Sequence, residues 1–342
     1  MRIKRIVIFV LLLCLHVSFF SSAEVLKGEE KFETYSYEDI VGSVGYITLS
    51  SNSNVRHIST TYIIHQDKKY SYIASSYVTS SSGYVKKAHF GNTNLDIELV
   101  GADETIDLAV FKFDRSLYDA PVLKMASSSY LRNGEYIFYV GLVGTDLNNA
   151  NVNVPVFSKE QTFVSKTDVV YCKNKYLYDC TNLMLIDSEL SSFSQGGPIF
   201  NAYGYVVGMV SMYNPVSDLE NGDELYHGTL SNDINVFLNR ILKHDLSRAD
   251  LGLYIDRIED LSIEKQKHLK LNINRGTIIT AVKNNASLSG IGTDYVITKI
   301  NGKRVETLSE LVSEMYKYNE RTIIKVTARK TNGSTETYYI KG

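Results

Sequence analysis

Three serines and a glutamine precede a Gly-Gly-Pro turn in the segment SSFSQGGPIF, residues 191–200. Ser191, Ser192 and Ser194 carry hydroxyls, and Gln195 stands directly before the two glycines. A serine hydroxyl attacks a carbonyl only when a histidine accepts its proton and a carboxylate orients that histidine. The chain therefore has to be searched for an imidazole and a carboxylate that its fold can bring to this turn.

Short strands are predicted for most of residues 40–231. The apolar runs SVGYITL, DLAVFKF and GYVVGMVSM are separated by Gly, Asn, Asp and Ser, a pattern typical of antiparallel sheets closed into barrels. A helix follows, and we expect Ser231 or Asn232 to cap its start. Its predicted apolar face consists of Ile234, Phe237, Leu238, Ile241 and Leu242.

A second unit is predicted after a polar linker, KHDLSRAD, at residues 243–250. Beyond it, LGLYI and GTIITAV indicate strands. Thr307 and Glu310 form a capping box at the start of a helix. One side of that helix is apolar and carries Leu308, Leu311, Val312 and Met315. Asn332-Gly333 predicts the turn of a closing hairpin.

Composition excludes some partners. The formal net charge is −2 and no basic stripe occurs, which argues against nucleic acid. Tyrosine is frequent, with 25 copies, whereas proline occurs 4 times and tryptophan is absent; this favours strands over helices. No Cys/His spacing suggests zinc, and we expect neither a metal nor any other cofactor.

The first residues have the pattern of an export signal. Arg2, Lys4 and Arg5 precede an apolar run and the small residues Ser21-Ser22-Ala23. We predict a signal peptide at residues 1–23 and a periplasmic or extracellular protein, with an uncleaved membrane anchor as the alternative.

Two cysteines lie close together after this signal. Cys172 and Cys180 flank the segment KNKYLYD. An exported protein meets an oxidising compartment, so a disulfide closing this loop is the favoured interpretation. Two free thiols in a surface hairpin are the alternative.

Several segments in order resemble the HtrA/DegP family of exported trypsin-like proteases with a PDZ domain. They are ELVGADETIDLAVFKFD (98–114), GGPIFNAYGYVVGM (196–209) and the stretch from LGLYI (251–255) to VITKINGKRV (296–305). The resemblance implies a mostly β fold: a trypsin-like double antiparallel β-barrel followed by an α+β PDZ domain. The implied domains are residues 24–245 and 250–342.

The resemblance also assigns the catalytic positions. Asp107 in TIDLAV matches the family's aspartate, but Tyr77 stands in ASSYV where a histidine is expected. Gln195 takes the serine position, and Phe193 takes that of an oxyanion-turn glycine beside Ser194 and Gly196.

These residue types are poorly suited to the family's chemistry. A phenol with a pKa near ~10 is a weak proton acceptor at neutral pH, and an amide side chain has no nucleophilic oxygen. Losing one such triad member costs roughly 10⁶ in turnover. A Cβ at Phe193 resists the positive φ that glycine tolerates, which would turn an oxyanion donor away. The sequence by itself therefore predicts a degenerate triad and a protein that is not an enzyme.

Two hypotheses concern the altered centre. We expect the hydroxyl of Tyr77 to donate a hydrogen bond to Asp107 in place of the former His–Asp pair. A rewired active site that uses a neighbouring serine, or one of His57, His65 and His89, is the alternative.

In a PDZ domain, an extended peptide adds a strand to a sheet edge and its terminal carboxylate meets successive backbone N–H groups. The resemblance assigns this carboxylate loop to Leu251, Gly252, Leu253 and Tyr254, and the opposite wall to the helix carrying Leu308, Leu311 and Met315. Asp250 replaces the family's aromatic residue before Leu-Gly. Its charge disfavours a ligand carboxylate, so an internal peptide segment is an alternative ligand.

The combined prediction is an inactive HtrA-like protein of the cell envelope that binds extended or unfolded polypeptide as a chaperone-like or regulatory protein. Its predicted partners are polypeptide segments or protein C-termini. Assembly as a homotrimer or a mixed trimer is also expected from the family, with KFETYSYEDI (31–40) as a candidate contact. The alternatives are a rewired serine endopeptidase and a structural subunit of an active family member.

Overall fold

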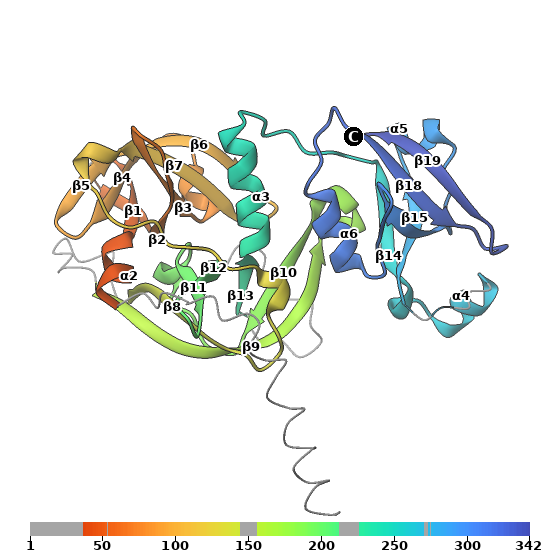
Figure 1. Cartoon of the computed structure of the whole chain (residues 1–342), viewed down its shortest axis with the longest axis horizontal. Coiled ribbons are helices and arrows are strands. Elements are labelled where there is room, and N and C mark those ends of the chain that lie inside the picture. Colours follow the sequence, from red (N-terminus) through yellow and green to blue (C-terminus); the bar gives the residue numbers. More distant parts are fainter. Residues whose placement is uncertain (1–36, 53, 144–155, 212–225, 270–272, 274) are drawn as a thin grey trace, which may run out of the picture. The chain divides into compact units, whose positions relative to one another are not determined.

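The computed structural model describes residues 37–52, 54–143, 156–211, 226–269, 273 and 275–342 (Figure 1). The described residues belong to one compact unit. The predicted signal peptide and the aromatic residues Phe32 and Tyr35 lie outside the described residues. Among the described residues, no helix has the length and apolar character needed to cross a membrane.

A seven-stranded antiparallel sheet, here called the first sheet, follows the short helix α2 (Tyr37–Ser43). Its order is β5-β4-β1-β2-β3-β7-β6. The strands are β1 (Val44–Ser51), β2 (Asn54–Gln66), β3 (Tyr70–Ser75), β4 (Val85–Phe90), β5 (Thr93–Asp96), β6 (Glu98–Asp103) and β7 (Leu108–Asp114).

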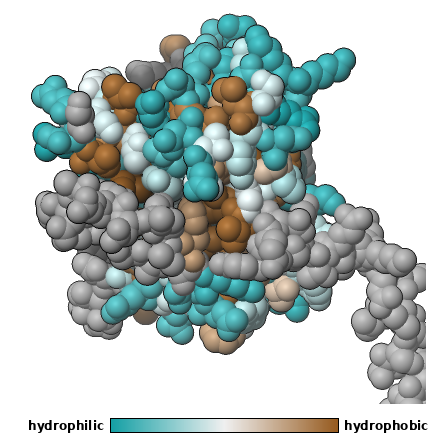
Figure 2. Space-filling model, turned by 90° about the vertical axis from the view of Figure 1, so that its left-hand side faces the viewer, coloured by the Kyte–Doolittle hydropathy of each residue, from teal (hydrophilic) through white to brown (hydrophobic). Residues whose placement is uncertain are grey.

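Alternating side chains of the first sheet form its core, which includes Ile47, Ile63, Ile73, Phe90 and Phe111. The strand pattern of the sequence places these side chains on one face, as the period of two requires. On the outer face that carries β4 and β5, hydrophobic residues lie between hydrophilic ones (Figure 2).

A closed barrel, here called the second barrel, has the strand order β10-β13-β12-β11-β8-β9. Its strands are β8 (Tyr136–Val143), β9 (Val156–Cys172), β10 (Cys180–Ile186), β11 (Pro198–Asn201), β12 (Val206–Ser211) and β13 (Tyr226–Leu230). Short 3-10 turns connect them, and those used below are η4 (Lys173–Lys175), η5 (Leu177–Asp179) and η6 (Ser192–Ser194).

Helix α3 (Ser231–Leu242) packs on β12 and β13 through the predicted apolar side chains Ile234, Phe237, Leu238 and Ile241. The predicted side-chain cap is wrong. The N-cap position is Leu230, with no side-chain cap hydrogen bond, and the Ser231 hydroxyl donates to the backbone oxygen of Ala126 instead.

The C-terminal region contains a third sheet in the order β14-β15-β16-β18-β19, with β17 paired to β16. The strands are β14 (Leu253–Arg257), β15 (Thr277–Val282), β16 (Val296–Ile300), β17 (Lys303–Arg304), β18 (Ile323–Arg329) and β19 (Thr335–Lys341). Helices α4 (Ile263–His268), α5 (Asn284–Ser289) and α6 (Leu308–Met315) accompany it. Thr307 caps α6 by accepting the Glu310 N–H, as the capping box predicts.

The predicted linker is held in place by specific contacts. Arg248 is nearly buried and donates to the backbone oxygen of Tyr178 at 2.7 Å. Its guanidinium also lies 3.5 Å from the Asp103 carboxylate and stacks over the Tyr316 ring. The mostly β fold class is confirmed, whereas the domain boundary near residue 245 stays a prediction.

Candidate functional site

Asp107 lies on the turn between β6 and β7, with a left-handed φ of 50° and a side chain that is almost fully buried. Its backbone N–H donates to the Glu104 oxygen at 3.2 Å, which closes the turn. Because non-glycine residues rarely adopt this φ, the turn aims the carboxylate inward at a small steric cost.

Three segments of the chain supply donors to this buried carboxylate. The Tyr77 backbone N–H donates to Oδ1 at 2.9 Å. The Ser211 hydroxyl donates to Oδ2 at 2.7 Å, and the Gln195 side-chain amide donates to the same oxygen at 3.4 Å. The tertiary structure therefore brings together all three positions that the resemblance assigned to the triad. Donors from several sides are what a buried carboxylate requires.

Tyr77 begins the 3-10 turn η1 (Tyr77–Ser80) and is half-buried. The backbone N–H of Tyr77 donates to Asp107, and the predicted donation by its hydroxyl stays a prediction. Main-chain donation does not depend on the side chain, so any residue except proline at position 77 could donate this hydrogen bond to Asp107.

Gln195 is 9% exposed and joins the first sheet to the second barrel. Its backbone oxygen accepts hydrogen bonds from the Thr60 N–H at 2.9 Å and from the Ser59 hydroxyl at 2.7 Å. Nearby, the Thr60 hydroxyl donates to the Phe193 oxygen at 2.7 Å. These contacts hold the turn before Gly196 against β2.

The predicted oxyanion turn adopts a 3-10 conformation. Phe193 lies inside η6, and its N–H donates to the Ser191 hydroxyl at 3.3 Å. The Ser194 hydroxyl donates to the Ser191 backbone oxygen at 2.6 Å. The left-handed φ of this segment belongs to Gly196, at 82°. In this conformation the Phe193 donor points back into its own turn.

Sequence reasoning missed several polar residues around this turn. Ser211, at the end of β12, donates to Asp107, and its position at the end of the run GYVVGMVS was the available signal. Ser59, Ser75 and Ser76 form a buried hydroxyl cluster, with Ser59 Oγ 3.0 Å from Ser76 Oγ and 3.2 Å from Ser75 Oγ. Alternation predicts strands there but does not show that their hydroxyls meet.

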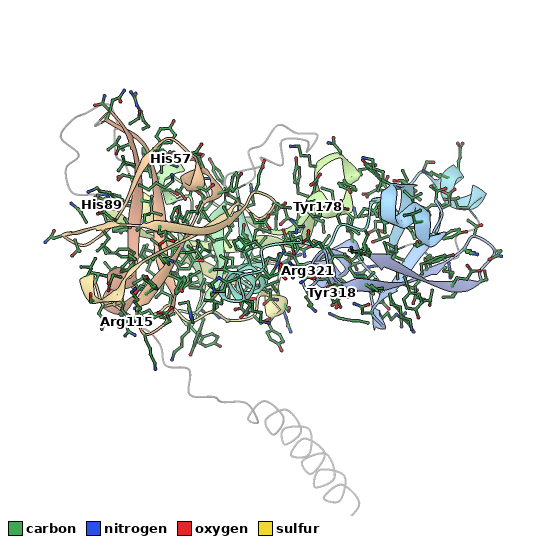
Figure 3. The ribbon with its side chains drawn as sticks, turned by 90° about the horizontal axis from the view of Figure 1, so that it is seen from above. His57, His89, Arg115, Tyr178, Tyr318 and Arg321 are labelled. Atoms are coloured by element: carbon green, nitrogen blue, oxygen red, sulfur yellow. A yellow bond between two sulfur atoms is a disulfide. The ribbon has the colours of Figure 1, made fainter. Side chains whose placement is uncertain are left out.

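The three candidate histidines belong to β2 and β4. Burial lowers the pKa of His57, whose Nε2 is buried without a partner among the described residues. His89 stacks on Tyr46 with ring centroids 4.4 Å apart, and desolvation lowers its pKa as well. Both histidines lie on the first sheet, at the left of Figure 3, whereas Tyr318 and Arg321 lie nearer the middle of the molecule. Neither belongs to the donors that surround Asp107.

In the C-terminal sheet, most of the predicted groove side chains are buried. Leu251, Leu253 and Leu311 are 2%, 0% and 0% exposed, and Leu308 and Met315 are also buried. Gly252 has a φ of 68°, and a Cβ there would lie 2.4 Å from the Lys283 oxygen, so the loop requires glycine. Tyr254 is half-buried and contacts Tyr176 of the second barrel.

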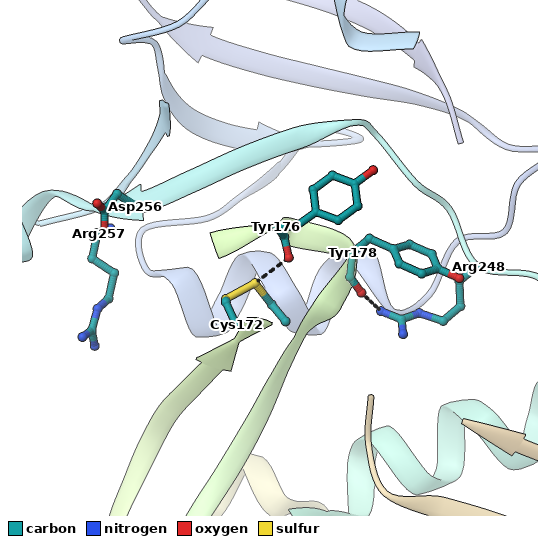
Figure 4. The surroundings of a disulfide bond; sticks show 7 residues. Cys172, Tyr176, Tyr178, Arg248, Asp256 and Arg257 are labelled. Atoms are coloured by element: carbon teal, nitrogen blue, oxygen red, sulfur yellow. Dashed lines mark hydrogen bonds between the residues drawn. A yellow bond between two sulfur atoms is a disulfide. The ribbon is translucent and has the colours of Figure 1, made fainter. Parts of the chain in front are cut away.

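The structure contains the Cys172–Cys180 disulfide (Figure 4). It joins the ends of β9 and β10 at the register pair Cys180–Cys172. Figure 4 places Tyr176 and Tyr178 next to this bond, with Arg248 reaching the Tyr178 backbone oxygen.

Comparison with known proteins identifies relatives of this chain. Residues 51–209 match the family model described as a trypsin-like peptidase domain. The chain is 24% identical over 264 residues to the serine protease Do-like HtrA of Lactobacillus helveticus, covering 75% of this chain and 62% of that protein. It is 23% identical over 258 residues to the periplasmic serine endoprotease DegP of Escherichia coli (strain K12), covering 74% and 50%.

A solved structure has the same fold over most of the chain. The HtrA-type protease AlgW with tripeptide superimposes with a TM-score of 0.65 at 17% identity, covering 90% of this chain and 96% of that one.

These findings correct one expectation. The prediction that this chain is not an enzyme is contradicted, because the relatives that it matches are named serine proteases and endoproteases. The prediction relied on the residue types at positions 77 and 195, whereas the similarity extends over about three quarters of the chain. The chain spans 50–62% of the length of the relatives described here. Its sequence is similar to those of the HtrA/DegP serine proteases, and residues 51–209 match a trypsin-like peptidase domain.

Proposed function

We propose that this HtrA-like chain binds extended or unfolded polypeptide in the cell envelope, by adding a segment as a strand to the outer edge of β14. The observation that carries the proposal is the position of β14 at the edge of the third sheet, next to the loop of Gly252. An edge strand presents backbone N–H and C=O groups to a partner, and peptide-binding modules use them in this way.

The comparisons support binding of a polypeptide. The similar solved structures include the HtrA-type protease AlgW with a decapeptide and with a tripeptide. The relative named a periplasmic endoprotease and the signal pattern at residues 1–23 support a location in the envelope. In this proposal the chain holds unfolded polypeptide in a chaperone-like or regulatory role.

Binding is tested with reduced, carboxymethylated lactalbumin, a permanently unfolded polypeptide, by fluorescence anisotropy. Gly252→Ala would force a Cβ to within 2.4 Å of the Lys283 oxygen at a φ of 68°. We expect this variant to bind at least ~5-fold more weakly, which corresponds to about 1 kcal/mol. Gly333→Ala is the matched control, because its φ is 86° and nothing lies within 4 Å of the added Cβ. Equal affinities for the two variants would refute binding at this loop.

Peptide hydrolysis is the second candidate function, because the relatives that the chain matches are named serine proteases and Asp107 keeps its set of donors. Gln195 has no hydroxyl, so a hydrolytic centre in this chain would have to use the hydroxyl of another residue. Casein turnover by the purified chain is compared with that of Ser192→Ala and Ser194→Ala variants. Turnover that one of these substitutions abolishes would identify the nucleophile.

Assembly as a homotrimer, or as a mixed trimer with another family member, stays a prediction. Native mass spectrometry of the purified chain and of material from its natural source distinguishes a monomer, a homotrimer and a mixed assembly of fixed stoichiometry. A mixed assembly would favour a structural subunit.

A further inference from the structure

The loop between β9 and β10 reaches the third sheet at the edge where a peptide would add. We call residues 172–180 the hairpin tip; it is closed by the Cys172–Cys180 disulfide. In sequence it lies far from β14 and α6, yet its turns η4 and η5 contact β14, and the strands β9 and β10 that carry it contact α6. In Figure 4 the tip lies beside β14, with the helix behind it.

The contact with β14 involves the backbone. Tyr176 and Tyr254 form an isolated antiparallel bridge. Because β15 pairs with the other side of β14, this bridge is on the outer edge of the sheet. The two rings lie with centroids 4.9 Å apart, and Lys283 Nζ is 4.6 Å from the Tyr254 centroid and 5.4 Å from that of Tyr176. A residue of this chain thus pairs with the edge as an added strand would.

Asp250 completes the contact at the carboxylate loop. One of its oxygens accepts the Gly252 N–H at 2.8 Å, and the Tyr176 hydroxyl donates to the same oxygen at 2.6 Å. A ligand's terminal carboxylate would need such loop N–H groups. The aspartate that departs from the family pattern therefore supplies an internal carboxylate, and the hairpin tip supplies its second donor.

Further contacts fix the tip at both sides. Lys175 Nζ forms an ion pair with the Asp256 carboxylate on β14 at 2.6 Å. At the base of the hairpin, the Asn182 side-chain amide donates to the Ser309 backbone oxygen at 3.2 Å and to the Ser313 hydroxyl at 2.8 Å, both on α6. The hairpin therefore contacts both walls that the resemblance assigned to a peptide groove.

The disulfide gives the tip a defined shape. It connects the ends of β9 and β10, and the residues between them form the two turns η4 and η5. A closed loop has fewer conformations to lose on docking, and its attachment to the same chain makes docking intramolecular. Both effects favour the tip over a free peptide of equal intrinsic affinity.

We propose that the hairpin tip is an intramolecular ligand of the β14–α6 groove, which an external polypeptide must displace, and that the Cys172–Cys180 disulfide strengthens this self-occupation. The proposal deepens the proposed function and rests on it. A dithiol reductant would open the groove by thiol–disulfide exchange. Its two thiols are oxidised to a disulfide, while Cys172 and Cys180 each gain one electron and one proton.

The first experiment adds the hairpin tip to the protein as a separate peptide. The probe is a fluorescein-labelled, oxidised synthetic peptide of residues 171–181. It is titrated into the wild-type chain and into a variant in which residues 173–179 are replaced by Asn-Gly and both cysteines by serine. We expect binding to the shortened variant at least ~10-fold tighter than to wild type, because the groove of the variant is vacant. Equal binding to both chains, or no binding to a folded shortened variant, would overturn the proposal.

Point variants keep the test valid if the shortened chain does not fold. Lys175→Glu reverses the charge facing Asp256, and Tyr176→Phe removes the donor to Asp250. We expect each to bind carboxymethylated lactalbumin at least ~3-fold more tightly than wild type. Lys173→Glu is the control, since it makes the same charge change on an exposed residue of the same turn. If Lys173→Glu has the same effect as Lys175→Glu, the specific contact with β14 is refuted.

The redox arm uses carboxymethylated lactalbumin, which has no disulfide to reduce. We expect dithiothreitol to tighten its binding to wild type at least ~3-fold, and to have no effect on the Cys172→Ser/Cys180→Ser double variant. A wild type insensitive to dithiothreitol would overturn the role of the disulfide.

The outcomes separate the two proposals. Trans binding of the 171–181 peptide, with no lactalbumin binding by any variant, would leave self-occupation standing and refute the proposed function. Lactalbumin binding of equal strength in every variant would support the function and refute self-occupation.

Discussion

Ser211 donates its hydroxyl hydrogen to Oδ2 of Asp107 at 2.7 Å, although 104 residues separate them in the chain. The bond connects β12 of the second barrel to the β6–β7 turn of the first sheet. Together with the Tyr77 N–H, it satisfies a carboxylate that is almost fully removed from water. Ser211, which is outside the three assigned triad positions, thus helps to maintain the orientation of Asp107.

Ser211→Ala should destabilise the fold by about 1–3 kcal/mol, because it removes a donor from a buried charged group. Urea unfolding monitored by tyrosine fluorescence gives the free energy of unfolding. Ser116→Ala is the control, since the exposed Ser116 also donates its hydroxyl to a carboxylate, that of Asp114 at 2.8 Å, but this carboxylate is exposed. If both variants lose the same free energy of unfolding, the hydrogen bond to the buried Asp107 stabilises the fold no more than an exposed one does.

Gly196→Ala should be severely destabilising. Its φ is 82°, and the added Cβ would lie 2.5 Å from the Thr60 oxygen and 2.7 Å from the Ser76 N–H nitrogen. Gly134→Ala is the control that measures the cost of the left-handed backbone alone, because its φ is 78° and nothing lies within 4 Å of the added Cβ. We expect about 1 kcal/mol for Gly134→Ala and at least ~3 kcal/mol for Gly196→Ala. Similar melting temperatures for the two variants would contradict the close approach of β2 to this turn.

Asp233→Asn should change the pH dependence of stability. Burial raises the pKa of Asp233 to about 7 from the model-peptide value of 3.8, against the opposing attraction of Arg248. Between these values the folded chain keeps a proton that the unfolded chain has lost, so this group destabilises the fold as pH rises from about 4 to 7. The variant should gain stability relative to wild type over that window, by on the order of 4 kcal/mol at most, and the gap should level off above pH 7.

Melting temperatures from pH 4 to 8 measure this gap. Asp245→Asn is a contrasting variant, because hydrogen bonds from Ser247 and Asn319 lower the pKa of Asp245. Its ionised carboxylate stabilises the fold, so this variant should lose stability relative to wild type as the pH rises. A gap between wild type and Asp233→Asn that does not vary with pH would contradict the prediction.

Glu314→Gln should destabilise the α6 region above pH 5. Burial alone would raise the pKa of Glu314, but hydrogen bonds from Lys303, Lys317 and Tyr318 together lower it to about 2. The ionised group therefore stabilises the fold above its unfolded pKa, and this stabilisation is lost as pH falls from about 4.5 to 2. Both lysines are about half exposed, so we expect a loss on the order of 1 kcal/mol.

The dependence on pH and salt identifies the cause. The stability gap between wild type and Glu314→Gln should shrink below pH 4 and also shrink in 1 M salt, measured by urea unfolding. A gap that is constant under both changes would mean that packing, rather than charge, is lost.

The sequence by itself determined the mostly β fold, the similarity to HtrA/DegP proteases and the local elements. Apolar alternation produces the strands because successive side chains point to opposite faces, and the Thr307–Glu310 box starts α6 through contacts within one turn. The cysteines, separated by 8 residues, could be paired because the hairpin between them is local. These features depend on neighbours in the chain.

Only the tertiary structure decided which distant groups meet. Ser211 reaches Asp107, Gln195 accepts hydrogen bonds from β2, and the tip of the β9–β10 hairpin pairs with β14 through Tyr176. Asp250 appeared from the sequence to be a charge unfavourable for a ligand carboxylate, and the fold gives it the Gly252 N–H and the Tyr176 hydroxyl as partners. Hydrogen bonds act over about 3 Å, whereas sequence patterns report only local spacing, so contacts between distant segments follow from how the sheets pack.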